Sequence, residues 1–186
     1  MPLKLLVVDD EPHVLKSMER ILREHASLFT VQTVANGTDA LALISGDKEG
    51  EYFCVISDLR MPDMNGIELL DKIRQVNVNI IRILVSGKLT LESTVQAVNQ
   101  GRVWHVIEKP YEKEEISNIV ISAYETFMCS RRKDAMTRET IEGAILILHD
   151  LLVLNNPMAY GMTLRIHNIV RHLLPLLPIN AKDMAD

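Results

Sequence analysis

The feature that most constrains this chain is an alternation of short apolar runs with longer amphipathic stretches before about residue 110. Five short apolar or β-rich runs predict strands over 3–8, 30–35, 52–57, 80–85 and 103–107. The stretches between the runs predict helices over 11–25, 38–45, 67–76 and 91–99. Strands that alternate with helices form a parallel sheet with helices on both faces. The pattern therefore predicts a doubly wound α/β domain.

Beyond residue 110 the sequence has helical signals and no strand signals. Apolar residues recur at helical spacing from Ile116 to Phe127, and the polar, mostly basic run 130–133 follows. This run predicts either a linker or a continuous helix. The segment 141–154 is apolar over most of its circumference, and a further helix is predicted over 163–174. We therefore divide the chain into an α/β domain (1–120), a helical linker (121–138) and a helical output or dimerisation segment (139–186).

Composition excludes several classes of protein. Apolar residues make up 47% of the chain and charged residues 24%, which is ordinary globular usage. The 25 acidic residues exceed the 20 basic ones, which argues against bulk electrostatic binding of nucleic acid. Cys54 and Cys129 are far apart in the sequence and suggest reduced thiols in a cytoplasmic protein. No apolar run approaches the roughly 20 residues that a bilayer-spanning helix needs, so no membrane contact is expected.

Charged and polar side chains follow the predicted strands. Asp9 and Asp10 end the first strand, Asp58 the third, Ser86 the fourth and Lys109 the fifth. The carboxyl ends of parallel strands meet at one edge of the sheet, where ligands of such folds bind. In the flavodoxin-like strand order 2-1-3-4-5 the first and third strands are neighbours. Three carboxylates, one hydroxyl and one ammonium are therefore expected at one edge.

This set of side chains predicts a metal-assisted phosphoryl chemistry. Three crowded carboxylates repel one another and need a cation, and oxygen ligands without His or Cys favour Mg²⁺. A carboxylate beside such an ion is suited to act as a nucleophile towards a phosphoryl group. The ion and Lys109 would then neutralise the transferring oxygens.

Four segments carry a family resemblance. They are 5–11 (LLVVDDE), 58–66 (DLRMPDMNG), 85–87 (VSG) and 108–110 (EKP), each at the end of a predicted strand. Together they resemble the receiver domain of two-component response regulators over about residues 1–120. The order and spacing of all four motifs make this resemblance specific.

The resemblance implies a role for each residue at the sheet edge. Asp58 would be the phosphoacceptor, and Mg²⁺ would be bound by Asp10, Asp58 and the backbone carbonyl of Arg60. Asp9 would contribute to the metal site largely through a water molecule. Ser86 would be the switch hydroxyl and Lys109 the phosphate-contacting cation. The partner implied is a sensor histidine kinase or a phosphotransfer protein.

One position departs from the family pattern. Receivers usually carry an aromatic residue three positions before the lysine, and this side chain rotates inward on activation. The corresponding residue here is Val106, and neither Trp104 nor His105 would occupy the same place. The usual coupling between hydroxyl and aromatic ring is therefore not expected in this chain.

The tail leaves three outputs open. Its apolar helices predict a homodimer, since such a helix is stable only when surrounded. The region 139–172 resembles the opening helices of an HD-type output domain, with Asn156-Pro157 and the stretch from Gly161 to Arg165 as the matching points, and His149-Asp150 resembles the metal-binding dipeptide of that family. This resemblance would make the chain the front part of a cyclic-di-GMP phosphodiesterase. Met162 stands where that family has a metal-binding His, so no hydrolase activity is expected. A helix-turn-helix DNA-binding output is the third possibility, although the predicted turn is longer than usual.

Overall fold

The computed structural model describes residues 2–87, 103–155 and 169. Five parallel strands form one sheet in the order β2-β1-β3-β4-β5, as predicted. The strands are β1 (Leu3–Val8), β2 (Phe29–Val34), β3 (Tyr52–Asp58), β4 (Ile81–Ser86) and β5 (His105–Glu108). The helices are α1 (Pro12–Leu22), η1 (Arg23–His25, a 3₁₀ turn), α2 (Gly37–Gly46), α3 (Gly66–Val76) and α5 (Lys113–Asn155). The predicted helices over 91–99 and 163–174 lie outside the described residues.

The predicted boundaries were close but not identical. The first helix was predicted over 11–25, whereas its α-helical part ends at Leu22 and a 3₁₀ turn covers the last three residues. Pro12 occupies the first turn, where its missing N–H costs nothing. The fifth strand begins at His105, two residues later than predicted.

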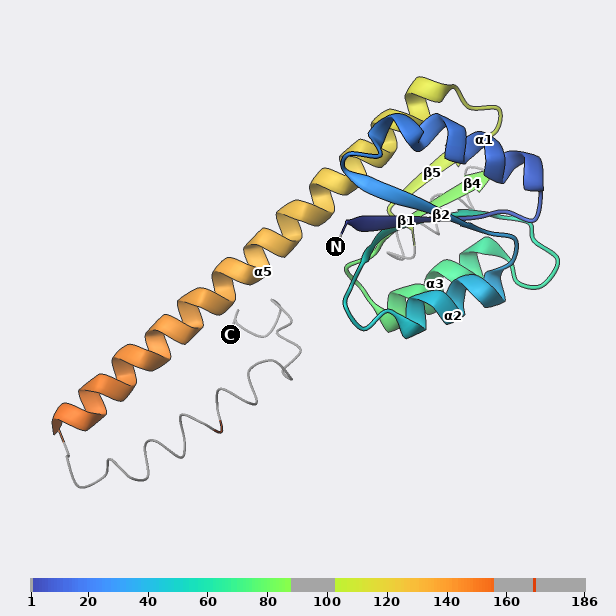
Figure 1. Ribbon diagram of the computed structural model, residues 1–186. Helices are drawn as coiled ribbons and strands as arrows, with labels where there is room; N and C mark the ends of the chain where they lie inside the picture. The colour runs from blue at the N-terminus through green and yellow to red at the C-terminus, as the bar shows by residue number, and fades with distance from the viewer. Residues whose placement is uncertain (1, 88–102, 156–168, 170–186) are drawn as a thin grey trace. The chain divides into compact units, whose positions relative to one another are not determined.

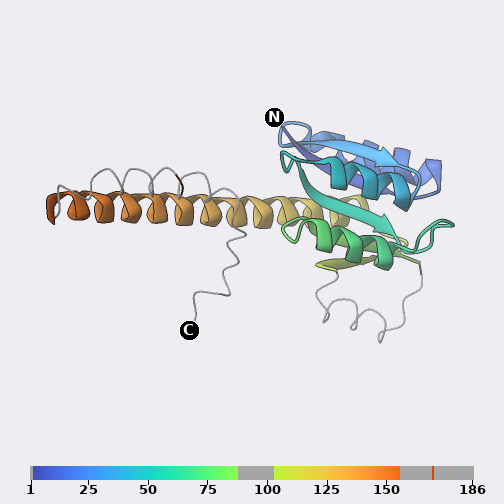
Figure 2. The ribbon, with the colours of Figure 1, turned by 90° about the horizontal axis from the view of Figure 1, so that it is seen from below.

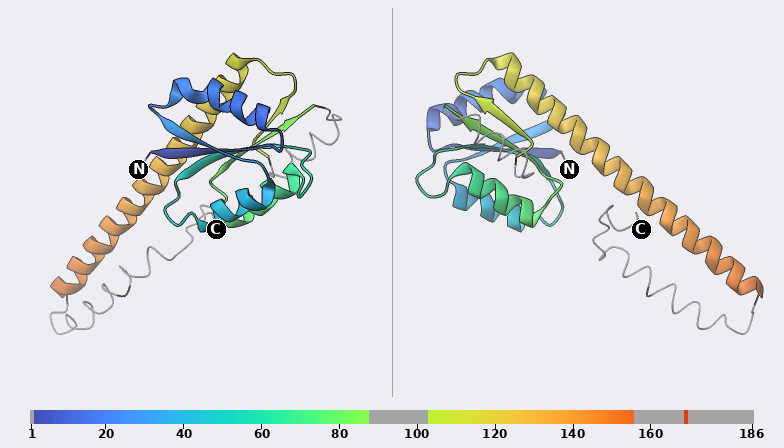
Figure 3. Two further views of the ribbon diagram at one scale, coloured as in Figure 1. Left: turned by 45° about the vertical axis from the view of Figure 1, so that its right-hand side comes forward. Right: turned by 180° about the vertical axis from the view of Figure 1, so that it is seen from behind.

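Helices cover both faces of the sheet, as Figure 1 shows, with α1 and the first part of α5 on one face and α2 and α3 on the other. The turned view in Figure 2 separates the same two layers. On the α1 face, Met18 and Leu22 pack with Ile116 and Val120 of α5. On the opposite face, α2 and α3 lie side by side in both views of Figure 3 and enclose the second core cluster. These two apolar layers hold the strand ends in fixed positions.

The chain divides into two compact units, 1–131 and 132–186. Helix α5 runs without a break from Lys113 to Asn155, so the polar stretch after Cys129 forms a continuous helix rather than a flexible linker. The predicted domain boundaries at 120 and 138 both lie inside this helix and stay predictions. Among the described residues, no helix is long and apolar enough to cross a bilayer.

Helix α3 approaches β3 so closely at Gly66 that only glycine fits. A Cβ atom built at Gly66 would lie 2.1 Å from the carbonyl oxygen of Asp58 and 2.9 Å from Cδ1 of Leu84. The N–H of Gly66 also donates to the carbonyl of Leu59 at 2.9 Å. The missing side chain therefore lets α3 begin directly beneath the strand end that carries Asp58.

We predict that Gly66→Ala lowers the free energy of unfolding by about 2 kcal/mol or more, since the backbone of β3 and α3 must separate. The matched control is Gly46→Ala, because a Cβ there meets nothing within 4 Å. Alanine at that helical position should leave stability unchanged or raise it by up to about 1 kcal/mol. Urea unfolding followed by circular dichroism measures both. Equal effects of the two substitutions would show that the close contact is unimportant.

Candidate phosphoacceptor site

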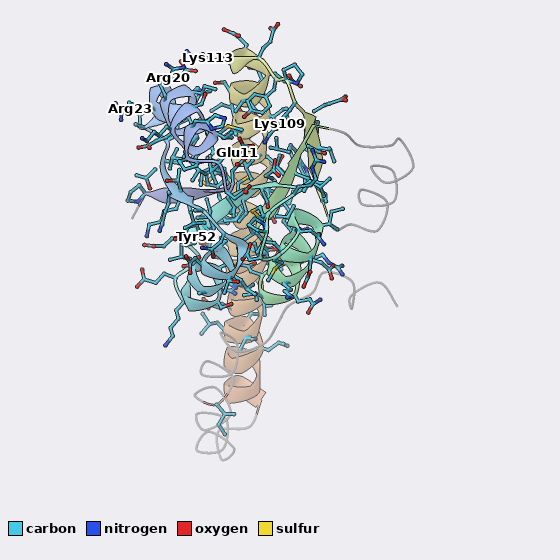
Figure 4. All side chains as sticks on the ribbon, turned by 90° about the vertical axis from the view of Figure 1, so that its right-hand side faces the viewer. Glu11, Arg20, Arg23, Tyr52, Lys109 and Lys113 are labelled. Carbon is cyan, nitrogen blue, oxygen red and sulfur yellow. The ribbon has the colours of Figure 1, made fainter. Side chains whose placement is uncertain are left out.

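The sheet edge brings Asp9, Asp58 and Lys109 together. The ammonium of Lys109 donates to Oδ1 of Asp58 at 2.6 Å and to Oδ2 of Asp9 at 3.2 Å. These residues come from the ends of β1, β3 and β5, which are far apart in the sequence. The parallel order of the strands therefore brings together three of the five predicted residues, and one cation bridges two acids. Figure 4 shows Lys109 together with Glu11, the residue that precedes α1.

Each carboxylate is also held by a backbone amide. The N–H of Glu11 donates to Oδ1 of Asp9 at 2.9 Å, and the N–H of Arg60 donates to Oδ2 of Asp58 at 2.6 Å. Both acids are buried, with 3% of Asp9 and 9% of Asp58 exposed. The two side chains therefore have fixed orientations. Within the described residues each of the four oxygens accepts one hydrogen bond, although a carboxylate oxygen has two lone pairs.

Burial and the neighbouring charges act in opposite directions on the pKa values of Asp9 and Lys109. Burial raises the pKa of Asp9, although the Glu11 amide and Lys109 work in the other direction. Burial also disfavours the charge on Lys109, but its hydrogen bond to Asp58 and the charge of Asp9 outweigh this effect and raise the pKa of Lys109. Lys109 therefore stays protonated at neutral pH. Within this cluster, the ionised form of Asp9 is the charge that the fold disfavours.

The other predicted site residues lie around this cluster in different environments. Ser86 is buried at the end of β4, and its carbonyl accepts the N–H of Lys109 at 2.8 Å. Asp10 and Arg60 are exposed. Val106 is partly buried and packs against the core cluster on the α2 and α3 face. The position that usually holds a switch aromatic is thus filled by a small aliphatic side chain in the core.

A magnesium ion fits the chemistry of these donors. The described residues contain no group of three His, Cys, Asp or Glu side chains that is already gathered around one point. The fit depends instead on the carboxylates of Asp9 and Asp58, which are fixed in orientation and have spare lone pairs. The exposed Asp10 and the backbone carbonyl of Arg60 would supply further hard oxygen donors. The donors are thus those that Mg²⁺ prefers.

An acid that the sequence analysis did not single out organises the loop beside the site. Asp63, in the loop between β3 and α3, accepts the backbone N–H of Thr38 at 2.9 Å and its hydroxyl at 3.0 Å. Burial is the largest single effect and raises the pKa of Asp63, but the hydrogen bonds from Thr38 and Gly37 together outweigh it and lower the pKa. The contact spans 25 residues and joins the loop after Asp58 to the start of α2. No local sequence signal indicates a helix cap supplied from so far along the chain.

The chain belongs to the response regulator receiver family. The family model for the response regulator receiver domain matches residues 5–121. This match and the five-stranded sheet agree with the resemblance found in the sequence. The matched part of the chain is therefore the receiver domain of a two-component response regulator.

Curated relatives match the same region. The transcriptional regulatory protein FixJ of Rhizobium meliloti is 34% identical over 119 residues, which cover 64% of this chain and 53% of the relative. The C4-dicarboxylate transport transcriptional regulatory protein DctD of the same organism is 35% identical over 112 residues, covering 60% of this chain and 23% of the relative. The chain thus matches about a quarter to a half of the length of these regulators.

Solved structures share the fold. A CheY-like response regulator receiver domain from Methanospirillum hungatei superposes with a TM-score of 0.63 at 25% identity, over 70% of this chain and 99% of that one. The signal receiver domain of an HD domain-containing protein from Pseudomonas fluorescens gives 0.62 at 26% identity, over 69% and 99%. Both matches are to receiver domains alone.

The burial of Asp9 yields a prediction on pH dependence. Because the pKa of Asp9 is raised in the folded protein, the folded state binds the Asp9 proton more tightly than the unfolded state does. The stability that this proton binding gives is fully present below pH 3.8, the ordinary pKa of the group, and is lost as the pH rises through the raised pKa. In the absence of divalent ions, Asp9→Asn should therefore stabilise the protein at pH 7, on the order of 1 kcal/mol. The advantage should shrink as the pH approaches 3.8.

Urea unfolding in EDTA at a series of pH values measures this difference. The control is Glu49→Gln, an exposed loop acid with no described ion pair, which should change stability by less than about 0.5 kcal/mol. An Asp9→Asn protein that is less stable than the parent at pH 7 would contradict the prediction.

Proposed function

We propose that this chain is a phosphorelay receiver that accepts a phosphoryl group on Asp58 from a histidine kinase or a phosphotransfer protein. The observation that supports this proposal most directly is the pair of contacts from Lys109 to Asp58 and Asp9. A nucleophilic carboxylate needs a fixed orientation and a cation beside the incoming phosphoryl oxygens. Asp58 has the first from the Arg60 amide and the second from Lys109.

The transfer step forms one bond and breaks one. An Asp58 carboxylate oxygen attacks the phosphorus, and the bond from phosphorus to the donor's leaving atom breaks, with the electron pair going to the donor. Lys109 moves its hydrogen bonds to the phosphoryl oxygens, and the Ser86 hydroxyl donates to the acyl phosphate. Mg²⁺, when bound by Asp10, Asp58 and the Arg60 carbonyl, with Asp9 acting through water, supplies positive charge to the same oxygens. Hydrolysis of the acyl phosphate then restores the carboxylate.

We predict that acetyl phosphate with Mg²⁺ adds one phosphoryl group to the protein, as measured by intact mass. Asp58→Asn should abolish the gain, and excess EDTA should suppress it, because the crowded carboxylates then repel the anionic donor. The matched control is Asp134→Asn, an exposed acid of α5, which should be phosphorylated like the parent. Undiminished labelling of the Asp58→Asn protein would overturn the assignment.

We also propose that the tail passes the signal by pairing with a second copy of the chain. Three consecutive large apolar residues of α5 are largely exposed, namely Leu146 (51%), Ile147 (64%) and Leu148 (60%). A helix with apolar residues on several sides needs neighbours, and a C₂ pair would supply them. The names of the relatives describe transcriptional regulators, whereas the matched region is the receiver, so the output proposed here depends on the helix alone. The tail itself is proposed to have no hydrolase activity.

We predict that the full chain is a dimer at tens of micromolar. Replacing Ile147 and Leu148 together with Glu should give a monomer, because charges on the paired surface would be buried without partners. The control is Met136→Glu, an exposed apolar position within the polar stretch of the same helix, which should remain a dimer. Light scattering measures the mass. A monomeric parent chain would disprove the pairing, as would a dimeric double variant.

A further inference from the structure

A cluster of three polar side chains joins the end of α1 to the start of α5. The Glu24 carboxylate, in η1, accepts the hydroxyl of Ser117 through Oε1 at 2.9 Å. Its Oε2 lies 2.8 Å from the ammonium of Lys113. Lys113 and Ser117 are four residues apart, so they lie on one face of α5 in consecutive turns. The carboxylate of Glu24 therefore contacts both of the first two turns of α5.

This cluster differs in kind from the other contacts between the same elements. Leu22, Ile116 and Val120 pack together through apolar surface, which stabilises contact but does not prefer one rotation of a helix over a nearby one. Hydrogen bonds and ion pairs are directional. The three polar side chains therefore set the rotation and the height of α5 on the α1–η1 corner. Figure 4 labels Arg23 of η1 and Lys113 of α5, and the contacts of Glu24 show that these two elements are adjacent.

The charges of the cluster suit this role. The hydrogen bonds from Lys113 and Ser117 lower the pKa of Glu24, against a small effect of burial, so the acid is ionised at neutral pH. The Glu24 and Lys113 side chains are 43% and 52% exposed, so their ion pair contributes little to global stability. Ser117 is buried, with 8% of its surface exposed, and secures the inner end of the cluster.

Both elements that the cluster joins start at the phosphoacceptor site. Helix α1 begins at Pro12, directly after the Glu11 amide that holds Asp9. Helix α5 begins at Lys113, four residues after Lys109. A phosphoryl group on Asp58 would draw Lys109 away from Asp9 and so shift the segment that leads into α5. Val106 offers no aromatic ring to carry the change along β5.

We propose that Glu24, Lys113 and Ser117 form a latch that fixes the first two turns of α5, and that the state of the Asp58 site reaches the rest of α5 through this latch. The second half of this proposal depends on the proposed function, whereas the first half does not. The latch is a device for positioning the output helix rather than for stabilising the receiver.

Hydrogen exchange of the full chain, read by mass spectrometry, tests the latch in two stages. In the unphosphorylated protein, Glu24→Gln should speed the exchange of amides in residues 117–121 by roughly three- to tenfold, since it removes a charge-assisted contact. The matched control is Glu19→Gln, an exposed acid of α1 with no described ion pair, which should leave this exchange unchanged. Unchanged exchange in Glu24→Gln would overturn the latch.

The second stage adds acetyl phosphate and Mg²⁺. In the parent protein, phosphorylation should change the exchange of residues 117–121. The Glu24→Gln protein should gain the same phosphoryl mass but show less than half of that change. An equal response in the two proteins, or no response in a phosphorylated parent, would overturn coupling through the latch. A parent that gains no phosphoryl mass would instead refute the proposed function, and the first stage would still decide the latch.

Discussion

The ammonium of Lys109 between the carboxylates of Asp58 and Asp9 is the interaction on which the rest of the site depends. Two buried acids placed side by side repel each other, and the cost rises because little water is present to screen them. Lys109 offsets this repulsion in the unphosphorylated protein. In the proposed phosphoryl transfer, Lys109 would also supply positive charge to the oxygens of the incoming phosphoryl group. The same contact would therefore serve both the resting fold and the proposed chemistry.

The position of this cluster was predictable because strand order alone determines it. Asp9, Asp58 and Lys109 each follow a recognisable apolar run, and parallel strands bring their carboxyl ends to one edge. The local geometry was not predictable. Asp63 caps α2 from 25 residues away, and Glu24 contacts Ser117 across 93 residues. Such contacts depend on how helices are oriented on the sheet, which no local spacing in the sequence encodes.

Helix α5 shows a second limit of sequence analysis. The polar stretch after Cys129 suits a linker and an exposed helix equally well, because neither has an apolar stripe. In the structure the helix continues through it to Asn155. A continuous helix transmits a rotation at its base to its far end, whereas a flexible linker does not. The first two turns of α5 contact Glu24, and residues 146–148 of the same helix are exposed apolar side chains.

We propose that Asp58 alone is the nucleophile among the acids at this edge of the sheet. Reduction of the phosphorylated protein with borohydride converts an acyl phosphate of aspartate to homoserine, and peptide mass spectrometry then locates the converted residue. After treatment with acetyl phosphate and Mg²⁺, we expect homoserine at position 58 and unmodified aspartate at positions 9, 10 and 63. Homoserine at any of those three positions, with Asp58 intact, would contradict the account.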